Sequence, residues 1–422
     1  MKGIRKWLLK DDKNILRKSA VWNLVSSIEY SLQSAVLMLI VTRVGGLYDA
    51  GVFTIAYTVT QMMATIGSYG MRSFQVSDIK KEYSFGSYLS SRLISILAMI
   101  VICMSYSFYQ GYDGSKLFVM AMLCCYRIVD DLEDVFHGEM QKSMRLDVAS
   151  KIMAVRIFIA TAAFGISYIV TKSLTVSSVV LTLTAAVVSL YLNLLVTGFF
   201  KDITFKLEKT GVIRLLWVCL PICIGGFLYN YLVNAPKYAI DRNLSEETQT
   251  IFSILFMPVF VINMLSSFIF KPMIVNMGIL WNDGKKKSFI ATVAKQMLMI
   301  IALTVICMLG GWLIGIDVLG FMYGVGLEEY RLLFTLLIAF GGMAALVSFL
   351  VVILTIIRKQ NYIMLAYGIG VATDWLFIDK IVTEYKIWGA GMIYGVAMSV
   401  IAAVLMIVMI VSIHRRKVVK ND

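Results

Sequence analysis

Residues 332–357 read LLFTLLIAFGGMAALVSFLVVILTII, without one charged residue. A bilayer core is about 30 Å thick, and a helix needs roughly 20 apolar residues to cross it. This stretch therefore predicts a transmembrane helix. Similar apolar stretches recur along the chain and together predict about twelve transmembrane helices, near residues 19–42, 50–71, 86–109, 116–137, 150–171, 175–199, 212–235, 249–274, 288–312, 331–356, 361–379 and 387–412.

The composition supports a membrane protein over its whole length. Hydrophobic residues make up 59% of the 422 residues, charged residues only 15%, and the mean hydropathy is +0.81. Ordinary soluble domains carry about 25% charged residues. We therefore expect an all-α membrane protein without a separate soluble domain, and we explain the net charge of +13 by membrane topology rather than by nucleic acid.

The distribution of Lys and Arg predicts the orientation. If the N-terminus is cytoplasmic, the inner segments hold 26 of the 39 basic residues and the outer loops hold eight, Lys237 and Arg242 among them. Both termini are then cytoplasmic. We expect a basic N-terminal segment at 1–18 and a basic tail at 414–422. The predicted location is a bacterial cytoplasmic (inner or plasma) membrane, which the chain crosses many times.

The first half of the sequence resembles the second. A shift of 199 residues lays Gly51-Val-Phe-Thr-Ile over Thr250-Ile-Phe-Ser-Ile, and it places Arg43 on Arg242. This predicts two parallel six-helix halves, 19–205 and 206–413, around a central cavity in which alternating access takes place. The alternative is that similar apolar helices match one another by chance.

Polar side chains recur at helical spacing in several predicted spans. Gln61 belongs to a stripe of Thr and Ser on the second span, Asn23 to a stripe on the first, and Asn230 to the seventh. We interpret these residues as the lining of the cavity. Hydrogen bonds between helices are the alternative, since Ser, Thr and Asn commonly provide them.

Charged residues inside spans are costly and are by default functional or paired. The basic candidates for substrate binding are Arg72, Arg92, Arg127, Lys271 and Lys295. Arg127 and Asp131 stand at i, i+4 and can pair on one helix. Glu29 is the candidate for proton or cation coupling. Snorkelling to the headgroups is the alternative for Arg92 and Lys295.

Catalytic motifs are absent from the sequence. It contains neither a G-x-x-x-x-G-K-[ST] phosphate loop nor a G-x-S-x-G elbow. The six cysteines lie in apolar segments, and Cys219 and Cys223 have no His or carboxylate beside them. We therefore expect a transporter rather than an enzyme, and neither a metal nor a cofactor.

Four stretches resemble a known family: Met71-Arg-Ser-Phe-Gln-Val-Ser-Asp78, Asp134-Val-Phe-His-Gly-Glu-Met-Gln141, Val318-Leu-Gly-Phe-Met-Tyr-Gly-Val-Gly-Leu-Glu-Glu-Tyr-Arg331 and Leu354-Thr-Ile-Ile-Arg-Lys-Gln360. They are similar to the polysaccharide-biosynthesis flippases that export O-antigen- and teichoic-acid-type repeat units. That family belongs to the multidrug/oligosaccharidyl-lipid/polysaccharide exporter (MOP) superfamily.

The resemblance implies a substrate, a polyprenyl-pyrophosphate-linked oligosaccharide that moves from the cytoplasmic to the outer leaflet. It also implies contact with membrane lipid, with a polysaccharide polymerase and with chain-length machinery. The basic candidates would bind the pyrophosphate, because arginine offers it paired hydrogen bonds, and the polar stripes would accommodate the sugars. The competing interpretation is an ion-coupled multidrug or metabolite antiporter of the same superfamily. A membrane-embedded polymerase or glycosyltransferase and a non-transporting scaffold are further alternatives.

Overall fold

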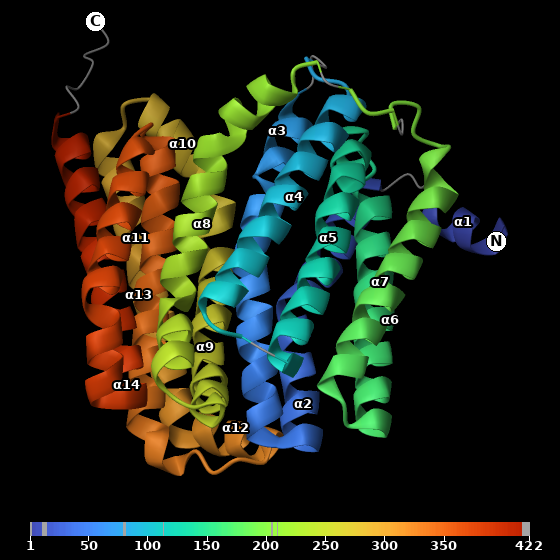
Figure 1. The fold of residues 1–422 in the computed structure, drawn as a ribbon. Helices are drawn as coiled ribbons and strands as arrows, with labels where there is room; N and C mark the ends of the chain where they lie inside the picture. Colours follow the sequence, from blue (N-terminus) through green and yellow to red (C-terminus); the bar gives the residue numbers. More distant parts are fainter. Residues whose placement is uncertain are drawn as a thin grey trace, which may run out of the picture. The chain divides into compact units, whose positions relative to one another are not determined.

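The computed structural model describes residues 2–10, 15–78, 82–112, 114–203, 206–208 and 210–415. This part of the chain is helical almost throughout and contains no β-strand. Its helices are α1 Lys2–Leu8, α2 Ile15–Ser68, α3 Met71–Ser77, α4 Phe85–Tyr109, α5 Gly114–Lys142, α6 Leu146–Thr171, α7 Leu174–Thr197, α8 Val212–Asn243, α9 Glu246–Phe270, α10 Ile274–Asn282, α11 Lys286–Gly310, α12 Ile316–Tyr323, α13 Arg331–Ile356 and α14 Asn361–Arg415 (Figure 1). Short 3₁₀ or π turns at Lys271–Met273, Gly311–Gly315 and Glu328–Tyr330 join neighbouring helices.

The predicted spans fall on these helices. Within the described residues, nine helical segments are long and apolar enough to cross a membrane. Two of them, α2 and α14, are each long enough to cross it twice. The helix α5 is not among the nine, because it carries many charged residues. The prediction of an all-α fold with about twelve membrane-spanning helices is confirmed.

The helix α2 folds back on itself at Gly46. A straight helix of its 54 residues would be about 80 Å long, more than twice the thickness of a bilayer core. Gly46 has a φ of 88°, which a residue without Cβ adopts readily. The two legs meet the same part of α5: the Tyr126 hydroxyl donates to Gln33 (3.0 Å), and the adjacent Arg127 donates to Gln61 (3.3 Å).

The helix α14 folds back in the same way at Lys386, whose φ is 51°. A Cβ on Gly370 would lie 2.7 Å from the side chain of Ile401. In a straight helix these two residues would be about 46 Å apart. The predicted pairs of spans at the start and at the end of the chain are therefore two helical hairpins, each closed by one non-helical residue.

One predicted outer loop is wrong. Residues 236–248 were expected between two spans, but α8 continues to Asn243 and α9 begins at Glu246. Lys237 and Arg242 are consequently helix residues rather than loop residues, and the Lys237 side chain is buried. The hydropathy pattern ends early here, because Asn234, Pro236 and Lys237 interrupt it although the backbone stays helical.

The chain divides into two compact units, residues 1–227 and 228–422, with the boundary inside α8. In the first unit α2 and α7 pack against α6, and α5 contacts α2, α4, α6 and α7. In the second unit α13 packs against α9, α11 and α14. The predicted halves 19–205 and 206–413, the cavity around which they were placed and the cytoplasmic position of both termini stay predictions.

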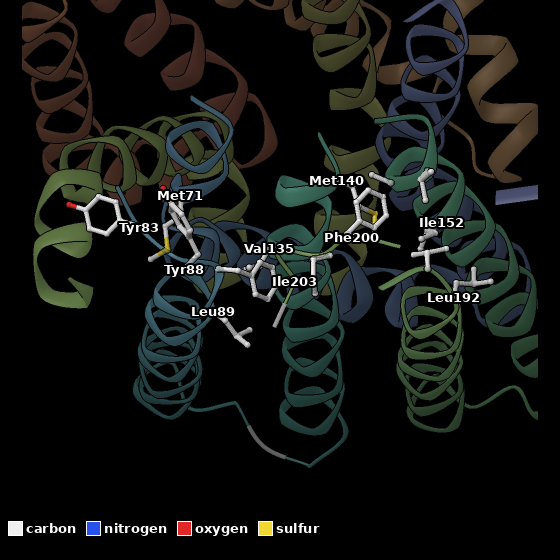
Figure 2. Close-up of a cluster of buried hydrophobic side chains, with 14 of the residues drawn as sticks. Met71, Tyr83, Tyr88, Leu89, Val135, Met140, Ile152, Leu192, Phe200 and Ile203 are labelled. Carbon is white, nitrogen blue, oxygen red and sulfur yellow. The ribbon is translucent and has the colours of Figure 1, made fainter. Parts of the chain in front are cut away.

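An apolar cluster closes one end of the first unit (Figure 2). Met71, Tyr88, Val135, Ile152 and Leu192 are members of it, so that it joins α3, α4, α5, α6 and α7. Val135 directly follows an acidic run on α5, and Tyr88 lies one turn before Arg92 on α4. The cluster therefore borders one end of the charged residues described below.

Asp78 follows α3 directly and is bound by residues at and before the start of α4. Its carboxylate accepts the amide protons of Glu82 (2.8 Å) and Tyr83 (3.1 Å) and the hydroxyl proton of Tyr88 (3.1 Å). Burial by itself raises the pKa of this carboxyl, but these hydrogen bonds and nearby Lys142 hold the pKa below its ordinary value. Asp78 thereby fixes the end of α3 relative to α4.

Candidate functional site

A stripe of charged residues runs along the buried side of α5. Its members are Arg127, Asp130, Asp131, Glu133, Asp134 and His137. Each of them stands three or four residues from another member, so they share one broad side of the helix. Arg127 is 1% exposed and Glu133 3%. Charge buried in this way must be paired or strongly hydrogen-bonded. Five residues of the stripe, together with three arginines from other helices, form the candidate site.

We call eight residues the charge network: Arg72, Arg92, Arg127, Arg156, Asp130, Asp131, Glu133 and Asp134. Arg156 of α6 connects two of the carboxylates. Its Nη2 lies 2.6 Å from Asp130, and its Nε donates to Glu133 at 2.8 Å. Asp130 also accepts from Arg127 (3.0 Å), so one carboxylate lies between two arginines. α5 and α6 are thus joined by ion pairs away from water.

Glu133 extends the network to α7. The Ser189 hydroxyl donates to its Oε1 at 2.8 Å, and the Asn193 amide donates to the same atom at 3.3 Å. Glu133 therefore receives two hydrogen bonds from α7 in addition to its ion pair with Arg156 of α6. Such additional donors offset the desolvation of a buried ion pair.

Asp134 connects α5 to α3 and α4. It binds Arg72 at 2.9 Å and Arg92 at 2.8 Å, one arginine on each carboxylate oxygen. Arg72 also donates to Gln141 through Nε (3.2 Å) and Nη2 (3.1 Å). The Arg92 side chain is fully buried, whereas that of Arg72 is 31% exposed. Arg72 is therefore the arginine of the network that a ligand from outside can reach most easily.

Arg92 also caps the end of α2. Its Nη1 donates to the Gly67 carbonyl at 3.0 Å, and the Ser95 hydroxyl donates to the same oxygen at 2.6 Å. Carbonyls in the last turn of a helix lack intrahelical donors and attract positive charge. Directly beyond lie Tyr69 and Gly70, both with positive φ (52° and 65°). This strained link leads into α3 and Arg72.

Arg127 does not pair with Asp131, contrary to the prediction from their spacing. Its carboxylate partner is Asp130 at i+3, its Nη2 donates to Gln61, and its guanidinium lies 4.4 Å from the ring centre of Tyr57. Arg156 approaches α5 from α6 and helps to hold Asp130, which the i, i+4 spacing could not reveal. Asp131 Oδ2 is buried without a hydrogen-bond partner in the described structure and lies against Gly67.

The first leg of α2 connects to the network through Tyr126. Gln33 accepts the Tyr126 hydroxyl proton and donates to Thr161 (3.1 Å), while Arg156 Nη1 lies 3.4 Å from the same hydroxyl oxygen. Glu29, one turn before Gln33, is half-buried, and its Oε2 has no hydrogen-bond partner within the described residues. The candidate coupling residue therefore lies one helical turn from Gln33, which reaches Arg156 of the network through Tyr126.

The structure brings together only some of the predicted substrate-binding residues. Arg72, Arg92, Arg127 and Gln61 meet at the network. Asn23 is exposed on the first leg of α2. Lys271 and Lys295 belong to the second unit and are exposed, and Asn230 is half-buried there with its carbonyl accepting from the Asn234 amide (3.1 Å). Whether any of these residues binds substrate stays a prediction.

Sequence analysis did not assign Arg156, Glu133 or Asp134 to the site. A signal for them was present: Arg127, Asp130, Asp134 and His137 recur at the spacing of one helix face. An acidic run at the end of a span is equally typical of a solvated helix end. Only the burial of these side chains in the structure distinguishes a charged site from such an end. Within the described ranges no group of three or more His, Cys, Asp or Glu side chains could hold a metal ion.

No protein-family model matches the sequence, and no curated protein matches it. Solved structures do match. The inward-facing conformation of a multidrug resistance MATE family transporter of the MOP superfamily has a TM-score of 0.65 at 10% identity, covering 93% of this chain and 98% of that one. The outward-facing conformation of such a transporter has a TM-score of 0.57 at 12% identity, with 98% of both chains covered.

A third match is a MOP superfamily transporter from Pyrococcus furiosus, described as having a binding pocket of reversed polarity that suggests a different function. Its TM-score is 0.58 at 13% identity, and 98% of both chains is covered. Identities this low establish the fold alone. The chain has the fold of MOP superfamily transporters.

Proposed function

We propose that the chain is a membrane transporter that flips polyprenyl-pyrophosphate-linked oligosaccharides from the cytoplasmic to the outer leaflet by alternating access, for the biosynthesis of cell-surface polysaccharide. Two observations support a transporter: the fold is that of MOP superfamily transporters, and the first unit carries a charge network that joins α5 to the membrane-spanning helices α4 and α6. Intramembrane charge commonly marks a substrate or ion pathway.

The position of Arg72 is the observation that most supports an anionic substrate. It is 31% exposed, it follows the strained Tyr69–Gly70 link, and it shares the Asp134 carboxylate with buried Arg92. A pyrophosphate offers oxygen pairs that match the guanidinium fork. We expect the pyrophosphate to replace Asp134 and Gln141 at Arg72, which leaves Asp134 to Arg92 alone and frees α3 to move.

The runner-up is an ion-coupled multidrug or metabolite antiporter. The four arginines of the network face four carboxylates, so neither sign of charge is in excess. A cationic substrate could pair with Asp134, whose side chain is 20% exposed. Multidrug transporters also stand among the structures with this fold. The fold itself does not decide the charge of the substrate, because another transporter with this fold is described as having a binding pocket of reversed polarity.

The test is a flipping assay with the full-length protein in vesicles. A fluorescent polyprenyl-pyrophosphate disaccharide is incorporated in both leaflets, and dithionite bleaches only the label in the outer one. We expect a protein-dependent second phase of bleaching as labelled lipid moves outward. Arg72→Gln should weaken substrate binding about tenfold or more, the cost of a lost charge-assisted hydrogen bond.

Arg242→Gln is the matched control, because Arg242 is equally exposed (30%) and also binds one carboxylate, Asp379, at 2.7 Å. It should flip the lipid like the wild type. Absence of the second phase with wild-type protein, combined with uptake of organic cations into the same vesicles, would exclude the flippase and favour the antiporter. If Arg72→Gln and Arg242→Gln reduced flipping of the labelled lipid equally, Arg72 would not be the substrate contact.

Glu29→Gln tests the coupling role. The substitution keeps the shape of the side chain and removes its charge. We expect flipping to lose its response to an imposed proton gradient while binding of the labelled lipid is retained. Glu384→Gln, at an exposed carboxyl of α14, should leave the response intact. A Glu29→Gln protein that responds to the gradient like the wild type would show that coupling resides elsewhere.

A further inference from the structure

The short helix α1 is fastened to α6 by one buried lysine. Lys151 Nζ donates to the carbonyls of Leu8 (3.3 Å) and Trp7 (3.5 Å), and it binds Asp147 at 3.1 Å. These carbonyls lie in the last turn of α1, where no intrahelical donor remains and positive charge is favourable. Lys151 is only 4% exposed. The contact therefore holds α1 at a defined position on α6.

Packing supports the same position. Leu8 is fully buried in the apolar cluster of the first unit, and the Trp7 ring lies edge-on to Trp22 of α2, with 5.7 Å between ring centres. In Figure 1, α1 lies across the direction of α6 rather than along it. This is the orientation of a helix in the plane of a membrane surface.

The exposed surface of α1 and of the residues directly after it combines basic and apolar side chains. Arg5, Lys6 and Lys10 are exposed, and none of them forms an ion pair within the described residues. Ile4 and Trp7 are 44% and 41% exposed beside them. Basic residues next to Trp and an aliphatic side chain are typical of helices that lie at the border between headgroups and acyl chains.

We propose that the exposed residues of α1 and the residue Lys10 that follows it, namely Ile4, Arg5, Lys6, Trp7 and Lys10, bind anionic phospholipid headgroups, and that Lys151 holds α1 at headgroup depth. The neighbouring part of α2 exposes apolar side chains, among them Val21 (53%) and Leu24 (47%), as a lipid-facing surface does. The basic residues of α1 therefore stand where that surface ends. This places a lipid leaflet opposite them rather than a nucleic acid or an acidic protein, and it does not depend on the proposed transport function.

The experiment uses the full-length protein in phosphatidylcholine vesicles that contain the same mole fraction of either brominated phosphatidylglycerol or brominated phosphatidylcholine. Quenching of Trp7 is obtained as the difference between the wild type and Trp7→Phe. We expect stronger quenching by the brominated phosphatidylglycerol. Each basic residue near an anionic surface contributes about a fivefold preference, so R5Q/K6Q/K10Q should abolish most of the difference between the two lipids.

K285Q/K286Q/K287Q removes the same number of charges beside α11 and should retain the difference. Lys151→Met keeps the three basic residues but releases α1, so quenching of Trp7 should lose its lipid preference while Asp147 stays paired with Arg145 (2.9 Å). Equal quenching by the two lipids in the wild type, or a preference that survives R5Q/K6Q/K10Q, would overturn the proposal. Unchanged quenching in Lys151→Met would show that Lys151 does not hold α1 at the headgroups.

Discussion

Replacing Arg156 with methionine is expected to lower the free energy of unfolding by about 3–5 kcal/mol, the cost of removing one partner from a buried ion pair. Arg156 is 1% exposed and binds both Asp130 and Glu133. Methionine fills much of the same volume but leaves Glu133 buried without a counter-ion. Unfolding of the purified protein in mixed micelles, followed by circular dichroism during a denaturant titration, measures the change.

Two variants separate lost charge from lost packing. Arg242→Met removes an arginine whose pair with Asp379 is largely exposed, and it should cost about 0–1 kcal/mol. In R156M/E133Q the unpaired carboxylate is neutralised, so part of the stability should return. If Arg156→Met and Arg242→Met had equal effects, the network would contribute no more to stability than a surface ion pair.

Gly67→Ala is expected to cost about 1–3 kcal/mol, the usual range for an overpacked core. A Cβ at this position would overlap Asp131 Oδ2 and lie 2.8 Å from Met99 Sδ. The Gly67 carbonyl also accepts hydrogen bonds from Arg92 and Ser95. Any shift of the backbone that relieves the overlap therefore disturbs the cap of α2 and the arginine that binds Asp134.

Gly225→Ala is the matched control, because no atom lies within 4 Å of a Cβ built there. In a helix interior, alanine is more favourable than glycine by about 0.5–1 kcal/mol. We therefore expect a slightly raised melting temperature for Gly225→Ala and a clearly lowered one for Gly67→Ala in a thermal-shift measurement. A Gly67→Ala protein as stable as the wild type would mean that Asp131 can move aside without loss.

Part of the site could be predicted from the sequence. Arg72, Arg92 and Arg127 were identified because charge inside an apolar span is conspicuous in any single helix. Their partners were not, since spacing along α5 allows Arg127 to reach either Asp130 or Asp131. The choice depends on Arg156 of α6, which shares Asp130 with Arg127 and also binds Glu133.

The sequence by itself determined the membrane fold, because each apolar stretch must satisfy its backbone hydrogen bonds internally and can do so within its own helix. The hydropathy pattern misplaced a helix end where the helix continues beyond its apolar stretch, as α8 does at Lys237. Tertiary structure alone decided which charged side chains form ion pairs with one another. Ion pairs join residues from α3, α4, α5 and α6, and the pairing of Asp134 with Arg72 and Arg92 exists only once those helices are packed together, because the three partners come from three different helices.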